Sequence, residues 1–336
     1  MPSSHAVKWR LRVVEPLVVV LGLDTMVMDN SEAAKWHGVK PTYKRIRGFQ
    51  PLQMTWGRFI VDAVFRAGDK HCNHADTAEK MVKKIRRHYR ENVPIIIRLD
   101  SGFFDQKLFQ VFEELGIGHI CCGKLYGDLT AYVASLLPNV WSRYQKGESA
   151  WDFVESGDRR ESWKIFRRAI FCRPLCEERQ YLLELSRPDT VLYTNLGRGE
   201  AIDERLRACG MLELVKPEKI IETYHGRGSD ELVHRALKDF ASEGLPFKRF
   251  AQNAAFYYTM LVAFSLYETF KEDVCIPVVK VTSYATTLRR RVIDIAAKVV
   301  RHAGKITLKV TTATWKGVKF AELWQRIGAP PHLVWA

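Results

Sequence analysis

Two short, almost entirely apolar runs predict strands that are buried on both faces. The first run, residues 17–23, reads Leu-Val-Val-Val-Leu-Gly-Leu, and the second, residues 94–99, reads Pro-Ile-Ile-Ile-Arg-Leu. Continuous apolar runs of this length are typical of central strands in a sheet that is covered on both sides. Asp24 follows the first run directly, and Asp100 follows the second. The pattern therefore predicts two core strands that each end at a carboxylate.

Helical and strand patterns alternate around these two runs, which predicts the α/β class. Gly57 separates two stretches with strand character, so a hairpin is expected there. Apolar residues at helical spacing, with basic residues covering much of the remaining surface, predict an amphipathic helix after the hairpin. The expected elements of this part are strands 43–56 and 59–67, helix 75–91, helix 104–115 and strand 118–122.

The pattern changes between about residues 125 and 190, where alternating segments are separated by turn residues such as Lys146-Gly147. This pattern predicts β-hairpins. Residues 191–196 form another expected strand, which either belongs to the core sheet or closes the hairpin region. The elements expected after it are helices over 200–209, 216–240, 250–267 and 285–303 and a strand over 306–312.

The chain carries a surplus of positive charge. Its 336 residues include 52 Lys and Arg against 38 Asp and Glu, which gives a net charge of +14. This surplus predicts attraction to a polyanion and favours nucleic acid as the partner over a merely basic protein surface. Basic segments at 80–90 and 289–291 are candidate contacts, with a solvated charged helix face as the alternative for the first.

Cysteine usage and hydropathy bear on the compartment. Seven scattered cysteines, an odd number in a long chain, argue against a secreted disulfide framework. Residues 1–15 contain no long apolar segment of the kind found in signal peptides. The longest uncharged apolar run, 250–267, contains Gln252 and Asn253, so it is typical of a buried helix rather than a membrane span. A soluble cytoplasmic protein without a membrane partner is expected.

Two clusters contain residue types that bind zinc. One is the stretch His71-Cys72-Asn73-His74, and the other is the pair Cys172 and Cys176. Neither cluster has a second pair at the spacing of a zinc finger or ribbon, so a structural zinc site is disfavoured.

A third pattern lies further along the chain, where Tyr224, Arg227, Glu231 and Lys238 occur with the spacing Y-x2-R-x3-E-x6-K. On a continuous helix the four side chains fall within an arc of roughly 60°. Gly226 and Gly228 flank the arginine, so a break in the helix at this point is an alternative. In either case the glutamate and the lysine share one face. A carboxylate surrounded by groups that bind phosphate suits an enzyme that holds a metal against a nucleic-acid backbone.

From about residue 17 to its C-terminus, the chain resembles the DDE transposases of bacterial insertion sequences that carry the Tyr-Arg-Glu-Lys (YREK) signature. The resemblance rests on this signature and on the two strand-end aspartates. It implies an α/β fold with a ribonuclease-H-like mixed sheet and flanking helices, interrupted by a β-rich insertion. The implied division is a short lead-in at 1–16, the first part of the core at 17–124, the insertion at 125–190, and the second part of the core with C-terminal helices at 191–336.

The resemblance implies that Asp24, Asp100 and Glu231 form a catalytic triad that holds two Mg²⁺ ions, with Mn²⁺ able to substitute. Oxygen ligands of this kind are what Mg²⁺ prefers, and a pair of ions can activate water and stabilise a leaving oxygen. An aspartate at the end of a strand is otherwise often a cap or a loop residue. Asp29 is a rival for the first position, and it ranks below Asp24 because it lies in the following loop.

The resemblance also implies residues that contact DNA. Tyr224, Arg227 and Lys238 correspond to family residues that bind phosphates near the transposon end, a role that suits the forked guanidinium and the ammonium group. The alternatives are core packing for the tyrosine and a free surface amine for the lysine. Aromatic residues of the insertion are candidates for stacking on an extruded base, although packing within the protein is the simpler role for each. These residues are Trp141, Trp151 and Trp163.

The expected function is the catalytic domain of a bacterial transposase, which cleaves a DNA strand and transfers the freed 3′-OH to target DNA. The expected partners are double-stranded DNA, at transposon ends and target, and other copies of the chain in a synaptic complex on the nucleoid. Family members of this kind have a sizeable region before the first aspartate that recognises the inverted repeats. Only 23 residues precede Asp24 here, so we expect that region to be missing. The alternative is a catalytically silent regulator that binds DNA or titrates a partner.

Overall fold

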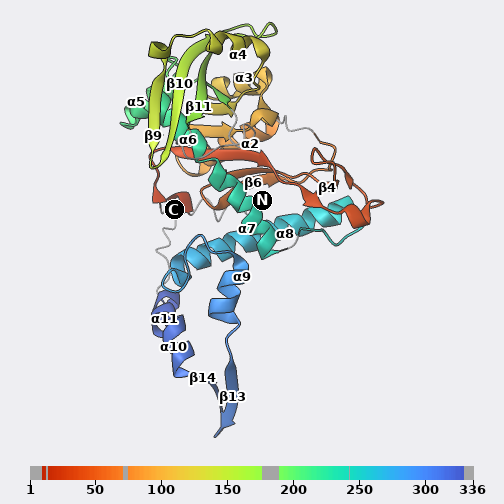
Figure 1. Ribbon diagram of the computed structural model, residues 1–336. Coiled ribbons are helices and arrows are strands. Elements are labelled where there is room, and N and C mark those ends of the chain that lie inside the picture. Colours follow the sequence, from red (N-terminus) through yellow and green to blue (C-terminus); the bar gives the residue numbers. More distant parts are fainter. Residues whose placement is uncertain (1–9, 13, 71–74, 176–188, 242, 329–336) are drawn as a thin grey trace.

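The computed structural model is a mixed α/β structure with a long C-terminal extension (Figure 1). It describes residues 10–12, 14–70, 75–175, 189–241 and 243–328. The cluster at 71–74 and Cys176, which the sequence marked as zinc-type residues, lie outside the described residues. Within the described part, no helix is long and apolar enough to cross a lipid bilayer.

A nine-stranded sheet organises the main body, in the order β6-β5-β1-β7-β8-β12-β11-β10-β9. The two apolar runs form its centre, because β1 pairs with β7 in parallel and β7 pairs with β8 in parallel. The neighbouring strands on either side are antiparallel. The strands are β1 (Val19–Thr25), β5 (Leu52–Trp56), β6 (Phe59–Val64), β7 (Ile95–Leu99), β8 (Gly118–Cys122), β9 (Ser142–Lys146), β10 (Ser149–Asp158), β11 (Arg167–Leu175) and β12 (Thr190–Thr194).

Strand β12 joins the two halves of this sheet. It pairs with β8 on one side and with β11 on the other, antiparallel in both cases. The sequence did not decide whether residues 191–196 belong to the core sheet or close the hairpin region. In the structure the strand does both. Strands β9, β10 and β11 extend the core sheet in one continuous ladder. Their segment also contains a helix, α4 (Gly127–Ala134).

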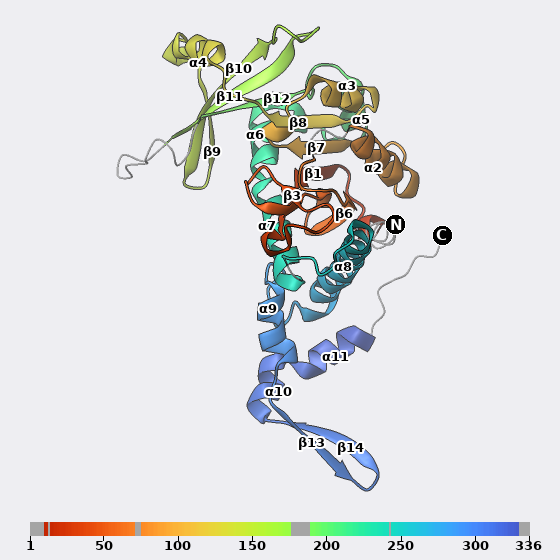
Figure 2. The same ribbon diagram turned by 90° about the vertical axis from the view of Figure 1, so that its right-hand side faces the viewer.

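Helices α2 (Ala75–His88) and α3 (Gln106–Glu114) cover one face of the sheet (Figure 2). Odd-numbered residues of the central strands, such as Leu21 and Ile97, point to this side and share a buried cluster with both helices. Asp105 caps the N-terminus of α3 by accepting a hydrogen bond from a backbone amide, as expected for an N-cap. The predicted helices at 75–91 and 104–115 are confirmed.

The opposite face of the sheet is covered by α5 (Ala201–Ala208) and α6 (Pro217–His225). Ile96 and Ile120 lie in a second buried cluster with residues of these two helices. Even-numbered residues of β7 therefore point to this face, because successive side chains of a strand alternate between its two sides.

The segment predicted as one helix over 216–240 consists of two helices, α6 and α7 (Gly228–Phe240). They meet at Gly226 and Arg227, where the break that the two glycines suggested occurs. Helix α8 (Phe250–Phe270) follows and packs with α7 in a third cluster that includes Ile60 of β6. The predicted helix 250–267 is thus confirmed, and it packs beside α7 against the β5–β6 end of the sheet.

The prediction of one strand over 43–56 is wrong in part. Residues Arg47–Phe49 form β4, which belongs to a separate small sheet with β2 (Met28–Asp29) and β3 (Lys40–Pro41). The chain then passes through Pro51 into β5. Proline lacks the backbone donor that a continuous ladder requires, which accounts for the interruption.

The prediction of a helix over 285–303 is also wrong for its second half. Residues Ala285–Leu288 form α9 and a π-helical turn follows, but Ala297–His302 form β13, which pairs with β14 (Lys305–Val310). The turn between the strands has positive φ angles at Ala303 and Gly304, and such a turn favours a hairpin. This ribbon projects from the body, beyond α10 (Thr312–Val318) and α11 (Phe320–Gly328), as both views show.

Candidate active site

The two predicted aspartates lie at adjacent strand ends on the α6–α7 face of the sheet. Asp24 is near the end of β1, and Asp100 directly follows β7, the parallel neighbour of β1. Leu23 is paired with Leu99 in this ladder, so the two aspartates occupy equivalent places one step further along. Their even numbers put both side chains on the same face as Ile96.

Glu231 reaches this place from the first turn of α7. Arg227 lies just before α7 begins, at the junction with α6, and its backbone is helical. The junction therefore holds an arginine and a glutamate four residues apart above the ends of β1 and β7.

The three carboxylates converge on the Arg227 guanidinium. Nη2 of Arg227 lies 2.8 Å from Oδ2 of Asp24 and 3.4 Å from Oδ2 of Asp100. Nη1 of the same group lies 3.2 Å from Oε1 of Glu231. Three acids from three separate parts of the sequence thus surround one cation.

Backbone amides hold the other oxygen of each aspartate. The amide of Thr25 donates to Oδ1 of Asp24 at 2.7 Å, and the amide of Gly102 donates to Oδ1 of Asp100 at 2.9 Å. Each aspartate therefore has one oxygen fixed by its own loop and one oxygen turned toward the shared centre. Side-chain exposure rises across the set, from 13% for Asp24 to 63% for Glu231.

Burial and mutual repulsion raise the pKa of both aspartates. For Asp24, desolvation raises the pKa, Arg227 lowers it, and Glu231 raises it again. For Asp100, desolvation and the neighbouring Asp24 raise the pKa against the opposing effect of Arg227. Burial lowers the pKa of Arg227 and the three carboxylates raise it, with a net rise. The site therefore contains more negative charge than one guanidinium balances.

A polar cavity of about 410 Å³ opens over these acids. Its wall includes a basic set that the YREK spacing alone did not identify, namely Lys44 and Arg235, together with the predicted Lys238. Lys44 precedes β4 in the chain, and Arg235 lies one turn after Glu231 on α7. Lys238 forms an ion pair with Glu243. Acids at the floor and cations at the rim suit a site for a polyanion.

Among the described residues, no group of three or more His, Cys, Asp or Glu has the arrangement of a metal site. A guanidinium nitrogen of Arg227 lies within 3.4 Å of an oxygen of each of the three carboxylates. Hard carboxylate oxygens with an excess of negative charge are suited to Mg²⁺ or Mn²⁺. The residues present fit such an ion once the guanidinium is withdrawn.

Tyr224 is half-buried beside Cys122 of β8, and burial raises the pKa of its phenol. The hydroxyl of Tyr224 is therefore less exposed to solvent than is usual for a side chain that binds a DNA phosphate. Asp29, the rival acid, accepts hydrogen bonds from the amide and the hydroxyl of Ser31. It lies at the end of the short strand β2 rather than in a loop, and the carboxylates paired with Arg227 are those of Asp24, Asp100 and Glu231.

The three tryptophans have different surroundings. Trp163 is buried against Phe104 and Tyr193 in the main core, so neighbouring side chains cover most of its ring. Trp141 packs edge-on against Phe171. Trp151 is half-exposed on β10, with its ring centroid 4.5 Å from that of His225 at the end of α6.

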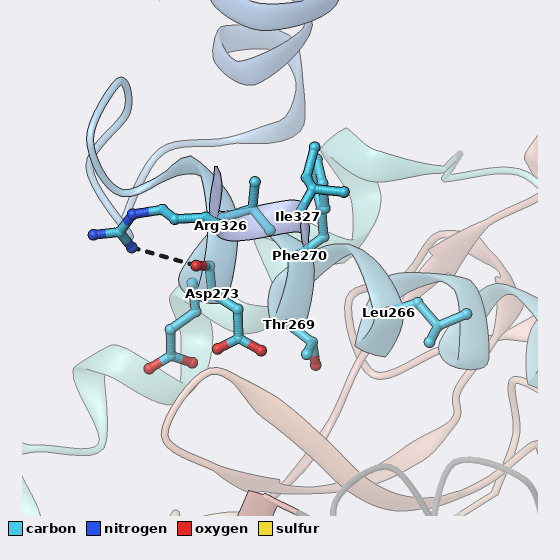
Figure 3. Close-up of a pocket in the computed structure, with 8 residues that line it drawn as sticks. Leu266, Thr269, Phe270, Asp273, Arg326 and Ile327 are labelled. Carbon is cyan, nitrogen blue, oxygen red and sulfur yellow. Dashed lines mark hydrogen bonds between the residues drawn. The ribbon is translucent and has the colours of Figure 1, made fainter. Parts of the chain in front are cut away.

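A second cavity, of about 670 Å³, lies between α8 and α11 (Figure 3). Leu266, Phe270 and Ile327 line it, and Arg326 donates a hydrogen bond to the backbone carbonyl of Asp273 at 3.3 Å. None of the residues that surround Arg227 lines this cavity, and its two acids, Glu272 and Asp273, each form an ion pair with Arg10. We therefore assign the candidate site to the polar cavity over β1 and β7.

The mixed sheet, the three converging acids and the basic rim define a candidate centre for phosphodiester chemistry. The chain belongs to the family described as Transposase DDE domain group 1, whose model matches residues 14–331. A chain in the cryo-EM structure of the piggyBac transposase synaptic complex with hairpin DNA also matches, with 11% identity and a TM-score of 0.41. The match covers 93% of this chain and 54% of that one, so this chain spans about half its length. A search of curated proteins finds no match.

Proposed function

We propose that this chain carries the catalytic centre of a transposase of the YREK group from a bacterial insertion sequence. It cleaves a DNA strand at the end of the element and transfers the freed 3′-OH to target DNA. Asp24, Asp100 and Glu231 are the proposed catalytic acids. The observation that carries the proposal is their convergence on one cation, Arg227, from three elements that are far apart in sequence. The strand order around β1 and β7 supports a ribonuclease-H-like assignment for the core.

Two Mg²⁺ ions, for which Mn²⁺ can substitute, would be held by these three acids and, when bound, would activate water and stabilise the leaving oxygen. The amides of Thr25 and Gly102 fix the aspartates in place for this role. Arg227 neutralises the acids in the absence of other cations. Once Arg227 has moved away from the acids, its planar guanidinium is also suited to bind two oxygens of one phosphate bidentately.

The proposed substrate is double-stranded DNA, bound through phosphates at the basic rim of the cavity. Lys44, Arg235 and Lys238 lie on this rim. Tyr224 lies near the end of α6, and Trp151 contacts His225 at the same helix end, a place where its ring would stack on an unpaired base. By resemblance, two or more copies act together on two DNA ends in a synaptic complex. Nucleoid DNA would then be the place of action.

Helix α2, whose basic face was the other candidate for DNA binding, is less suited to it. Lys84 pairs with Asp62, Lys83 pairs with Glu79, and Arg86 donates to the carbonyls of Leu115 and Gly116. The helix also covers the face of the sheet opposite to the acids. Several of its charges therefore serve the protein's own structure.

The test is nicking of supercoiled plasmid DNA that carries the element's own ends, with Mn²⁺ or Mg²⁺ and with chelator as the blank. We expect metal-dependent nicking by the wild-type chain and a loss of at least about 10²-fold in Asp24→Asn, Asp100→Asn and Glu231→Gln. Asp29→Asn is the matched control and should keep wild-type activity. Equal activity in all four variants, or no nicking by a wild-type chain that binds this DNA, would overturn the proposal and favour the silent regulator.

A further inference from the structure

A buried ion pair lies directly behind the candidate site. Nη2 of Arg98 on β7 is 2.9 Å from Oδ1 of Asp230 on α7, and the two side chains are only 9% and 1% exposed. Arg98 is two residues before Asp100, and Asp230 is the residue before Glu231. The pair therefore connects the strand that carries one proposed catalytic acid to the helix that carries another.

The sheet leaves room for this carboxylate at a glycine. Gly22 on β1 is the register partner of Arg98 and lies two residues before Asp24. A Cβ atom at Gly22 would be 2.2 Å from Oδ2 of Asp230 and 2.6 Å from Oγ1 of Thr55 on β5. The first turn of α7 is thus fitted into a slot formed by three adjacent strands.

Arg98 also holds the other side of the helix junction. Its Nη1 atom donates to the carbonyl of Thr223 in α6 at 3.3 Å. A Cβ atom at Gly226 would be 2.5 Å from the same Nη1. One guanidinium therefore contacts the end of α6 and the start of α7 on either side of Arg227.

We propose that Arg98 and Asp230 are the positioning pair of the active site, which fixes the α6–α7 junction so that Arg227 and Glu231 meet Asp24 and Asp100. This inference rests on the proposed function for its catalytic readout. The free-energy cost of taking two charges out of water can exceed the attraction between them in a buried pair. Replacement of such a pair by apolar residues is often neutral or stabilising, so stability alone gives no reason for charges here. A reason for charges here is that Arg98 contacts both α6 and α7 and so fixes the position of their junction.

The most direct test compares the two glycines that flank Arg227. Gly226 has helical φ and ψ angles, so alanine is tolerated by the backbone, but its Cβ displaces the Arg98 guanidinium. A Cβ at Gly228 meets no atom within 4 Å, which makes Gly228→Ala the matched control. We expect Gly226→Ala to reduce the nicking rate at saturating DNA by about 10²-fold, because misplacement by about 1 Å has such an effect. The KM for DNA should stay near wild type, and the loss of rate should persist per folded molecule, because displacement of the buried guanidinium also lowers the melting temperature.

Hydrogen exchange of the backbone amides at 223–231 gives a readout that does not depend on catalysis. We expect faster exchange there in Gly226→Ala and in Asp230→Asn, and wild-type exchange in Gly228→Ala. Glu268→Gln removes one charge from the buried Glu268–Lys271 pair, which is as buried but lies on α8 and the turn after it. This variant should lose stability while exchange at 223–231 and the nicking rate per folded molecule are unchanged.

The outcomes separate the two proposals. Wild-type exchange at 223–231 in both Gly226→Ala and Asp230→Asn would overturn the positioning role, whatever the enzyme does. A wild-type chain that binds DNA and does not nick it would overturn the proposed function, while the exchange data would still decide whether the pair fixes the junction. If Glu268→Gln lost as much nicking activity as Asp230→Asn, the Arg98–Asp230 pair would contribute only to overall stability and would not position the active site.

Discussion

Arg227 and Asp24 form the shortest of the three ion pairs around the Arg227 guanidinium, with 2.8 Å between Nη2 and Oδ2. The same guanidinium nitrogen lies 3.4 Å from Asp100. An arginine that bridges two strand-end aspartates satisfies their charge without a metal, yet it occupies the space that a shared cation needs. The account therefore makes Arg227 a competitor of the ion that the acids are suited to bind.

Replacement of Arg227 by Gln should destabilise the chain and increase its response to metal. Loss of one partner of a largely buried ion pair costs about 3 kcal/mol in typical cases, and three acids would be left to repel one another. Because binding to the folded state alone stabilises it, millimolar Mn²⁺ should raise the melting temperature more in Arg227→Gln than in wild type. Arg235→Gln on the rim is the control. Equal metal responses in all three chains would show that Arg227 does not compete for the site.

The His234 imidazole should make part of the stability pH-dependent. Its Nε2 atom is buried and has no hydrogen-bond partner within the described part of the chain. Burial, aided by Arg227, lowers the pKa of His234 to about 4. In the unfolded chain the group binds a proton below about pH 6.5, so the free energy of unfolding should fall as the pH drops from about 6.5 to 4.

The comparison that isolates this effect is between wild type and His234→Gln, by chemical denaturation at each pH. Asp230 acts with the opposite sign in part of the same range, since burial raises its pKa to about 6, and it is present in both chains. We expect a smaller loss of stability on acidification in the variant. An identical pH profile would mean that His234 already takes up a proton normally in the folded state.

Binding to DNA should depend steeply on salt and on the rim of the cavity. If about 6–10 phosphates are neutralised, affinity should fall by about 10³–10⁵ between 50 and 200 mM salt. Lys44→Gln and Arg235→Gln should each reduce the slope of log K against log salt by about one. Lys83→Gln on α2, where the lysine pairs with Glu79, should leave the slope unchanged. A larger effect at Lys83 than at the rim would move the DNA to the other face of the sheet.

The sequence predicted the elements of the site better than their contacts. Apolar runs that end at Asp24 and Asp100 were sufficient to identify two buried strands, since only a central strand is apolar on both faces. The glycines around Arg227 suggested the break between α6 and α7. The spacing of the signature then placed Glu231 and Lys238 on one helix face.

Other features depended on tertiary structure. The contact between Arg98 and Asp230 joins residues that are far apart in sequence. The local sequence around Arg98 does not show whether this arginine has a buried partner or is exposed to solvent. Residues 297–302 were predicted as helix because their periodicity is ambiguous over so short a run, and pairing with β14 decided the outcome. The packing of Trp163 against Phe104 and Tyr193 likewise joins residues from separate elements, which no local pattern shows.

Localised cleavage of the polypeptide by bound Fe²⁺ would show where the folded chain holds a divalent ion. Fe²⁺ replaces Mg²⁺ or Mn²⁺ at oxygen-ligand sites, and with ascorbate and peroxide it breaks the nearby backbone. The account predicts fragments whose ends map near Asp24, Asp100 and Glu231, competed away by excess Mn²⁺ and lost in Asp24→Asn, with Asp29→Asn unchanged. Cleavage at other positions, or the same fragments in Asp24→Asn and in wild type, would contradict a metal centre at these three acids.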